Sequence, residues 1–195
     1  MKILIACEFS GIVRDAFIAR GHDAWSCDLM PTERPGPHLQ LDVTNIVNEQ
    51  PWDMMIAFPP CTHLSVSGAR WFKNKQEEQA KALNFIRMLL NAPMHKIAIE
   101  NPVGIISTHI RKPDQIIQPY EYGDSFSKKT CLWLKGLDKL IPTKIVDVGE
   151  RLRYNSGRSL PKWYADSFNL PPKDRAMFRS RTFSGIAKAM SEQWG

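Results

Sequence analysis

Short apolar runs and longer segments with helical periodicity alternate through the first half of the chain. Strands are expected where the apolar runs occur, over residues 2–7, 23–27, 38–42, 54–58 and 97–99. Apolar residues recur every three or four positions over residues 13–20, before Gly21, and most regularly over residues 76–90, which predicts two amphipathic helices. Strands that alternate with helices in this way predict an α/β fold with a doubly wound, mostly parallel, Rossmann-like sheet.

The second half of the chain has a less regular pattern. A strand is expected over residues 130–134, a short helix over 173–178 and a final helix over 183–193. Residues 148–172 are rich in Gly, Ser, Pro, Arg and Lys, which is typical of a long functional loop or a small insertion. We therefore expect a single domain over residues 1–195, divided into a cofactor-binding and catalytic core (1–117), a short basic recognition-like region (118–178) and a closing helix packed on the core (179–195).

The composition fits a globular protein with a hydrophobic core. Of the 195 residues, 43% are hydrophobic and 24% are charged, and no stretch approaches the ~20 apolar residues of a membrane span. The first apolar run is too short for the core of a signal peptide. The four cysteines do not have the Cys-x-x-Cys spacing of zinc sites, and they do not suggest a disulfide framework. These observations predict a cytoplasmic protein with no bound metal and no membrane partner.

The net charge of +6 is concentrated in the second half of the chain. Residues 1–101 carry ten Lys and Arg against eleven Asp and Glu, whereas residues 102–195 carry sixteen against nine. The basic half also contains many Tyr, Trp and Phe residues, and cations interleaved with aromatic rings suit a phosphate backbone with unstacked bases. The alternative is a solvated basic face above ordinary core aromatics. Nucleic acid is favoured as a partner only together with the chemistry described next.

A cysteine and a carboxylic acid follow two of the predicted strands. Cys61 comes after Pro59 and Pro60 at the end of one apolar run, and Glu100 and Asn101 come at the end of another. The carboxyl ends of parallel strands meet at one edge of an open sheet, so we expect the thiol and the acid to share one cleft. A thiolate beside a proton donor suits attack on an electron-poor ring such as a pyrimidine. The alternatives are an inert buried thiol and a carboxylate that caps a helix.

One glycine and two acidic residues mark a candidate nucleotide site at the same edge. Gly11 follows the first strand, where glycine permits a tight turn beside a ligand. Asp28 follows the second strand and is spaced to meet ribose hydroxyls, and Asp42 ends the third strand, where it would meet an adenine. Each acid alone is more often a helix cap or a solvated loop residue. The chain has no Gly-x-x-x-x-Gly-Lys phosphate loop, so hydrolysis of nucleoside triphosphates is not indicated.

These motifs, in this order, resemble those of the cytosine-5 DNA methyltransferases, which use S-adenosylmethionine as the methyl donor. The segment Glu8-Phe9-Ser10-Gly11 resembles the family's cofactor loop. Phe58-Pro59-Pro60-Cys61, followed by Ser65 and Gly68, resembles the nucleophile motif, and Glu100-Asn101-Pro102 resembles the Glu-Asn-Val motif. The resemblance implies that the cofactor is bound by Glu8, Phe9, Ser10, Gly11, Asp28, Asp42 and Pro59.

The resemblance also implies a mechanism. The Cys61 thiolate would add to C6 of cytosine and load electron density onto C5, while Glu100 protonates or polarises N3. C5 then takes the methyl group, and a base removes the C5 proton and expels the cysteine. Asn101 would orient the loop, Ser65 would contact the substrate, and in duplex DNA the base would first be flipped out. Because a free thiol with a pKa near 8.5 is mostly protonated, a helix start after Cys61 or a nearby cation is expected to favour the thiolate.

The chain departs from the family's pattern in several places. Val13-Arg14 stand where the cofactor loop often has a Gly-Gly pair, and Thr62 replaces the usual glutamine after the cysteine. A Gln-x-Arg-x-Arg motif, whose arginines help to hold the flipped base, is missing. The segment Gln118-Pro119-Tyr120-Glu121-Tyr122 has the glutamine but neither arginine. Four cations remain as candidate replacements for substrate binding, and the sequence does not choose among Lys128, Lys129, Arg151 and Arg153. The target-recognition region is also very short, which indicates a compact or reduced member.

Three functional hypotheses follow. The first is a DNA (cytosine-5)-methyltransferase that depends on S-adenosylmethionine, with DNA as its partner. The second keeps the same core but acts on RNA or on a free pyrimidine nucleotide. The third is a catalytically degenerate protein that binds DNA or serves as an accessory subunit, which the missing arginines favour and the retained Cys61 and Glu100 oppose. A homodimer or a separate recognition subunit is left open.

Overall fold

The computed structural model of the chain describes residues 1–49, 51–67 and 74–195. Gly68, which the nucleophile motif includes, lies outside the described residues. No helix among the residues described is long and apolar enough to span a membrane.

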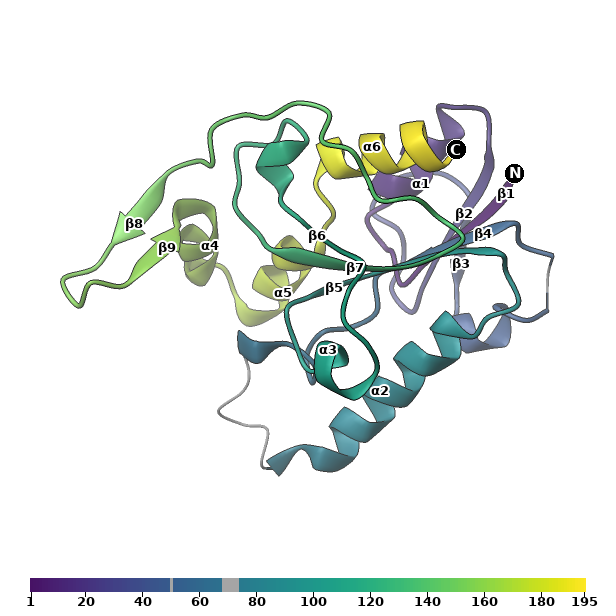
Figure 1. Cartoon of the computed structure of the whole chain (residues 1–195), viewed down its shortest axis with the longest axis horizontal. Coiled ribbons are helices and arrows are strands. Elements are labelled where there is room, and N and C mark those ends of the chain that lie inside the picture. Colours follow the sequence, from purple (N-terminus) through teal and green to yellow (C-terminus); the bar gives the residue numbers. More distant parts are fainter. Residues whose placement is uncertain (50, 68–73) are drawn as a thin grey trace.

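A central sheet of seven strands organises the described part of the chain (Figure 1). Its spatial order is β3-β2-β1-β4-β5-β7-β6, and β7 runs antiparallel to both of its neighbours. The strands are β1 (Lys2–Ala6), β2 (Asp23–Asp28), β3 (His38–Gln40), β4 (Met54–Ala57), β5 (Lys96–Pro102), β6 (Gln115–Ile117) and β7 (Thr130–Lys135). The doubly wound, mostly parallel, Rossmann-like sheet that the sequence predicts is therefore confirmed.

Helices cover both faces of this sheet (Figure 1). The helices α1 (Ile12–Ile18) and α6 (Ser184–Trp194) lie on one face, and α2 (Gln76–Leu90) and α3 (Ile106–His109) lie on the other. Successive side chains of a strand point to opposite faces, so Ile3 and Ile5 pack under α1 and α6 while Leu4 packs against the α2 layer. Because helices cover both faces of the sheet, β4 is buried along its whole length. This coverage explains why its sequence is a continuous apolar run.

Residues 148–183 form a lobe at one end of the sheet (Figure 1). It contains the hairpin of β8 (Arg151–Arg153) and β9 (Ser159–Pro161), then α4 (Lys162–Asp166) and α5 (Pro172–Ser180). Of the two structures expected for residues 148–172, the chain therefore forms the small insertion and not the long loop. The described chain also includes the 3-10 turns η1 (Val43–Asn45), η3 (Pro119–Glu121) and η4 (Ser167–Asn169).

Aromatic rings form the interior of this lobe. Trp163 lies edge-on to Phe126 and Phe183, with ring centroids 6.1 Å and 5.8 Å away. The Arg179 guanidinium lies 3.8 Å from the Tyr164 ring centroid and donates a 2.7 Å hydrogen bond to the Ser167 hydroxyl. These rings therefore pack against one another within the lobe.

Two other boundaries differ from expectation in ways that affect the site. The strand expected over 97–99 extends from Lys96 to Pro102, so Glu100 and Asn101 lie within β5 rather than after it. β5 pairs with β7 as far as Pro102 and Thr130, and this pairing keeps the two polar residues within the strand. The sequence pattern missed β6, whose three residues are too few to show a period.

Candidate active site

The carboxyl ends of the parallel strands bring the predicted acids and the predicted nucleophile Cys61 to one edge of the sheet. Asp28 ends β2, Asp42 follows β3, and Cys61 comes four residues after β4. Between β2 and β4 lies β1, which is followed by Cys7. The edge at which a doubly wound sheet binds ligands therefore carries the predicted side chains.

A cavity of about 390 Å³ opens at this edge. Its volume lies within the roughly 300–1,000 Å³ of small-molecule sites. Leu29, Leu41, Val43 and Phe85 supply apolar walls, while the polar groups come from Asp28, Asp42, His63, Glu78 and Lys81. Cys7, Cys27, Pro60 and Ala82 complete the lining. The combination of apolar walls with two carboxyl groups suits a flat heteroaromatic ring attached to a hydroxylated sugar.

The two predicted acids have different surroundings. Asp28 is partly buried and accepts a 2.9 Å hydrogen bond from the Met30 amide, and burial raises the pKa of its carboxyl group. Asp42 is exposed and caps η1 by accepting hydrogen bonds from the amide and hydroxyl of Thr44, both 2.9 Å long. Asp42 is therefore the helix cap that the alternative interpretation proposed, and it also lines the cavity.

The sequence analysis missed two side chains that line this cavity. Cys7 has a φ of 57°, a left-handed conformation that is uncommon for a residue with a β-carbon. His63 lies two residues after the predicted nucleophile, and its Nδ1 is buried without a hydrogen-bond partner among the described residues. Neither carries a recognisable spacing signal, because each reaches the cavity through the local course of a loop.

Residues 8–11, in the turn after β1, shape the start of α1 rather than the cavity wall. Glu8 is buried and accepts hydrogen bonds from the Ser10 hydroxyl (2.8 Å) and the Val13 amide (2.9 Å), so its carboxyl group caps α1. Gly11 has a φ of 71°. None of Glu8, Phe9, Ser10, Gly11 and Pro59 lines the cavity. Their contact with a cofactor stays a prediction.

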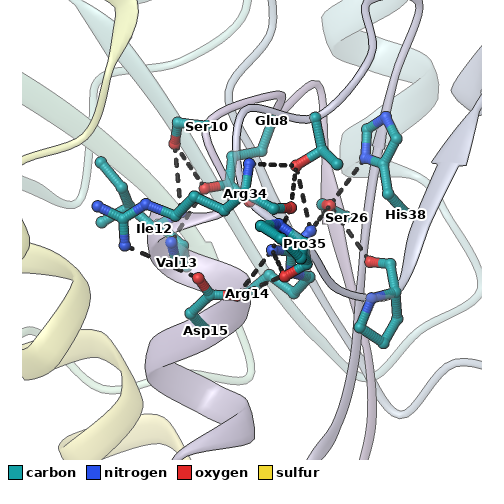
Figure 2. A network of polar contacts seen from close by, with 12 residues as sticks. Glu8, Ser10, Ile12, Val13, Arg14, Asp15, Ser26, Arg34, Pro35 and His38 are labelled. Atoms are coloured by element: carbon teal, nitrogen blue, oxygen red, sulfur yellow. Dashed lines mark hydrogen bonds and ion pairs between the residues drawn. The ribbon is translucent and has the colours of Figure 1, made fainter.

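Arg14 is a fully buried tether between α1 and the segment after β2 (Figure 2). Its guanidinium donates to Asp15 (2.9 and 2.7 Å), Ser26 (3.1 Å) and Thr32 (3.2 Å). It also donates to the carbonyl oxygens of Arg34 and Pro35, both at 3.2 Å. Because the tethered segment begins at Asp28 and Leu29, Arg14 helps to hold one wall of the cavity in place.

Cys61 is exposed beside this cavity, between the cavity-lining residues Pro60 and His63. The amides of Leu64 and Ser65 both donate to its carbonyl oxygen at 3.0 Å, which forms a tight turn. Although the residue is exposed, loss of water around the thiol raises its pKa, and the Glu100 carboxylate raises it further. The Lys128 ammonium opposes both effects. A helix start or a nearby cation was expected to favour the Cys61 thiolate, and Lys128 is such a cation.

Glu100 and Asn101 leave opposite faces of β5 because they are adjacent in a strand. Asn101 is fully buried, and its amide donates a 2.8 Å hydrogen bond to the carbonyl oxygen of Pro59. This bond ties β5 to the loop that carries Cys61, as expected for a residue that orients the loop. On the other face, desolvation raises the pKa of Glu100, while Lys128 and a hydrogen bond from Thr130 lower it.

A second, much smaller cavity lies against Glu100. Its lining consists of Phe58, Glu100, Lys128, Thr130, Ser180, Thr182, Phe183 and Ile186. The volume is about 10 Å³, room for roughly one water molecule. Lys128 donates a 2.9 Å hydrogen bond from Nζ to the carbonyl oxygen of Arg179, and its Nζ lies 5.7 Å from the Phe183 ring centroid. The segment before α6 therefore covers the Glu100 side of the site.

The structure separates the four candidate cations and places Ser65 in a loop contact. Lys128 lies beside Glu100, Lys129 is exposed, and Arg151 and Arg153 project from β8. Ser65 is buried, shares a 2.9 Å hydrogen bond with Ser67 and forms an isolated bridge with Gly104. Of the proposed replacements for the missing arginines, Lys128 is thus the one next to the predicted acid. In the described part of the chain, no group of three or more His, Cys, Asp or Glu side chains is placed to hold a metal ion.

Comparisons with known proteins add little to this geometry. No protein-family profile matches the chain, and no curated protein has significant similarity to it. Among solved structures, the chain is similar to an E. coli prophage protein proposed to be a DNA modification methyltransferase, with a TM-score of 0.48 and 14% sequence identity. The match covers 87% of this chain and 55% of that one, so this chain spans about half the length of that protein. A likeness at this level carries no argument about activity.

Proposed function

We propose that the protein is an S-adenosylmethionine-dependent methyltransferase that modifies C5 of cytosine in DNA through a covalent adduct with Cys61. The observation that carries the proposal is the meeting of Cys61, Glu100 and Lys128 at one edge of the sheet, next to the cavity lined by Asp28 and Asp42. The order of the corresponding motifs along the chain supports the same assignment.

The residues of the larger cavity fit the proposed cofactor. Asp28 and Asp42 would accept hydrogen bonds from ribose hydroxyls and an adenine amino group, and Leu29, Val43 and Phe85 would contact the ring. When bound, the cofactor supplies an electrophilic methyl group on a positively charged sulfur. The orphaned Nδ1 of His63 is a further polar group available to a ligand of this cavity.

The chemistry rests on the thiol and the carboxylic acid. The Cys61 thiolate forms a bond to C6 of the ring, and the displaced electron pair moves toward C5 and N3. Glu100, whose raised pKa keeps it protonated to higher pH than a free glutamate, donates a proton or a hydrogen bond to N3. After C5 has taken the methyl group, loss of the C5 proton to a base restores the double bond and releases the thiolate.

Lys128 and Asn101 support these two groups. Lys128 lowers the pKa of both Cys61 and Glu100, so it favours the thiolate in an otherwise desolvated site. It also supplies the positive charge that the missing arginines would bring to a flipped base. Asn101 is a positioning residue, because it acts on the Cys61 loop through the Pro59 carbonyl oxygen.

A cytosine ring can reach Glu100 only if the cover over the second cavity moves. The cavity holds about one water molecule, and Ser180, Thr182 and Phe183 form part of its wall. Arg181, in the same segment, forms an ion pair with Glu33 at 2.5 Å. We therefore expect entry of the flipped base to displace residues 180–183.

The proposal is tested by incubating wild type, Cys61→Ser, Glu100→Gln and the neighbouring control Thr62→Ala with tritiated S-adenosylmethionine and mixed-sequence duplex DNA. Parallel reactions receive transfer RNA or deoxycytidine monophosphate. Label in 5-methylcytosine from DNA with wild type and Thr62→Ala, and none with Cys61→Ser, is the expected result. DNA that contains 5-fluorocytosine should trap a covalent complex on Cys61. Label confined to RNA or to the nucleotide, or no label from a protein that binds the cofactor, would overturn the assignment.

A further inference from the structure

The lobe beyond β7 carries most of the net charge of the protein. Residues 148–183 contain eight Lys and Arg against three Asp and Glu, a net charge of +5 in a chain whose total is +6. The lobe projects from one end of the sheet, and the β8–β9 hairpin forms its outermost part (Figure 1). A concentrated positive charge on a projecting element is the electrostatic footprint of a surface that contacts nucleic acid.

The hairpin is ordered and exposed at the same time. Arg151 pairs with Pro161, and Arg153 pairs with Ser159. The turn is closed by hydrogen bonds from the Tyr154 amide to the Arg158 carbonyl oxygen and from the Gly157 amide to the Tyr154 carbonyl oxygen, both 2.9 Å long. Gly157 has a φ of 77°, which the turn requires. Every residue from 150 to 158 is exposed, so this backbone order is not imposed by burial.

The contacts at the base of the hairpin leave its tip free. Lys162 forms an ion pair with Glu150 at 2.6 Å, and Arg151 donates to the Ser159 hydroxyl at 2.9 Å. Arg153 and Arg158, nearer the turn, have no side-chain hydrogen bond or ion pair within the part of the chain that the structure describes. Two unpaired guanidinium groups therefore lie on a preorganised ribbon, on either side of Tyr154 and Asn155.

We propose that the β8–β9 hairpin enters the major groove of duplex DNA and selects the sequence that surrounds the modified base, an inference that rests on the proposed function. The major groove, about 12 Å wide, admits a two-stranded β-ribbon. Arginine reads guanine through a bidentate pair of hydrogen bonds to O6 and N7, and asparagine reads adenine in the same manner. Arg153, Arg158 and Asn155 thus supply base-reading groups at the exposed tip of the hairpin.

The base of the hairpin is joined to the catalytic side of the molecule. Arg151 donates a 3.3 Å hydrogen bond to the Ser127 hydroxyl, and Trp163 donates at 3.3 Å to the Ser127 carbonyl oxygen. The next residue is Lys128, which lines the cavity beside Glu100. The hairpin is therefore joined directly to the segment that carries Lys128.

The test is a binding selection, which does not depend on methyl transfer. Four proteins each select from a duplex library with a randomised core. They are wild type, the double variant Arg153→Ala with Arg158→Ala, the double variant Arg153→Lys with Arg158→Lys, and the exposed control Arg20→Ala. Wild type and Arg20→Ala are expected to enrich one motif. Both double variants are expected to lose it, because lysine keeps the charge but cannot form the bidentate pair. Affinity for the enriched duplex should fall about fivefold or more in each.

Three outcomes would overturn the inference. They are retention of the motif by the double variants, recovery of the motif by the lysine pair, and tighter binding of wild type to the single strand than to the duplex. Methylation of the selected duplex is then assayed separately. A protein that selects a motif through Arg153 and Arg158 but forms no 5-methylcytosine would refute the proposed function and leave the role of the hairpin standing. Methylation of DNA by variants that still select the wild-type motif would refute the role of the hairpin and leave the proposed function standing.

Discussion

Replacing Arg14 with methionine tests the claim that one buried guanidinium holds a wall of the larger cavity. Methionine keeps much of the length and apolar volume of the side chain but removes every donor. Two of the lost hydrogen bonds join Arg14 to Asp15 within α1, and four join it to Ser26, Thr32 and the carbonyl oxygens of Arg34 and Pro35 (Figure 2). The four longer-range bonds are the ones that connect α1 to β2 and to the segment after it.

The size of the stability loss depends on which other hydrogen-bond partners each acceptor keeps after the substitution. Ser26 keeps a 2.8 Å hydrogen bond with His38, and Arg34 and Pro35 are exposed, so their carbonyl oxygens can be rehydrated. Asp15 is about one-third exposed, so its charge is not left in a dry site. We therefore take each of the four bonds near the low end of the usual net range, about 0.5–0.8 kcal/mol. Their loss should lower the free energy of unfolding by about 2–3 kcal/mol, less than the 3–5 kcal/mol for breaking a fully buried pair.

Urea denaturation followed by tryptophan fluorescence measures this change. Arg20→Met, at an exposed arginine just after the same helix, is the matched control and should change the free energy of unfolding by at most about 0.5 kcal/mol. Arg14→Lys keeps the charge but not the planar set of donors, so it should recover less than half of the loss. If Arg14→Met were as stable as Arg20→Met, the network would be a consequence of the local fold and not a tether.

Three further predictions concern the catalytic side. Asn101→Ala should lower the free energy of unfolding by about 1–3 kcal/mol and slow formation of the covalent complex with 5-fluorocytosine DNA, because the Pro59 carbonyl oxygen loses a buried donor; an unchanged trapping rate would contradict a positioning role. Lys128→Met should move the alkylation of Cys61 by iodoacetamide, followed by mass spectrometry, to higher pH, because the ammonium lowers the pKa of the thiol; an unmoved or lower midpoint would refute this. Folding raises the pKa of Glu100 above its unfolded value near 4.5, so its contribution to stability is present below that pH and is lost as pH rises through the folded pKa. The stability advantage of Glu100→Gln over wild type, from urea titrations at several pH values, should therefore grow above about pH 4.5, by at most about 1.4 kcal/mol per pH unit, and a difference independent of pH would contradict the assignment.

Sequence patterns were most informative where a local feature has one structural outcome. The apolar run of β4 and the amphipathic spacing of α2 led directly to a buried strand and a covering helix. The same patterns placed Cys61 and Glu100 near the ends of neighbouring strands. Sequence reasoning was less successful for β6 and the β8–β9 hairpin, whose strands of three residues are too short to show a period and are stabilised by cross-strand pairing.

The candidate site was predictable to a similar extent. Asp28 and Asp42 were expected at a ligand site and line the larger cavity, whereas the Glu8 carboxyl turned out to cap α1. A carboxylate beside a glycine turn looks the same in sequence whether it meets a ligand or a backbone amide. His63 and Cys7 could not be found in advance, because their access to the cavity depends on the path of two loops and not on spacing.

By itself, the sequence determined the alternation of strands and helices, the basic second half and the order of the Cys61 and Glu100 motifs, because these depend on periodicity, composition and residue type. Only the tertiary structure decided which cation stands beside Glu100 and what Arg14 does. Lys128 reaches that position through the antiparallel pairing of β7 with β5, and Arg14 finds its partners through the return of the chain after β2. Such contacts join residues that are distant in the sequence, and no local propensity encodes which of several similar side chains will meet.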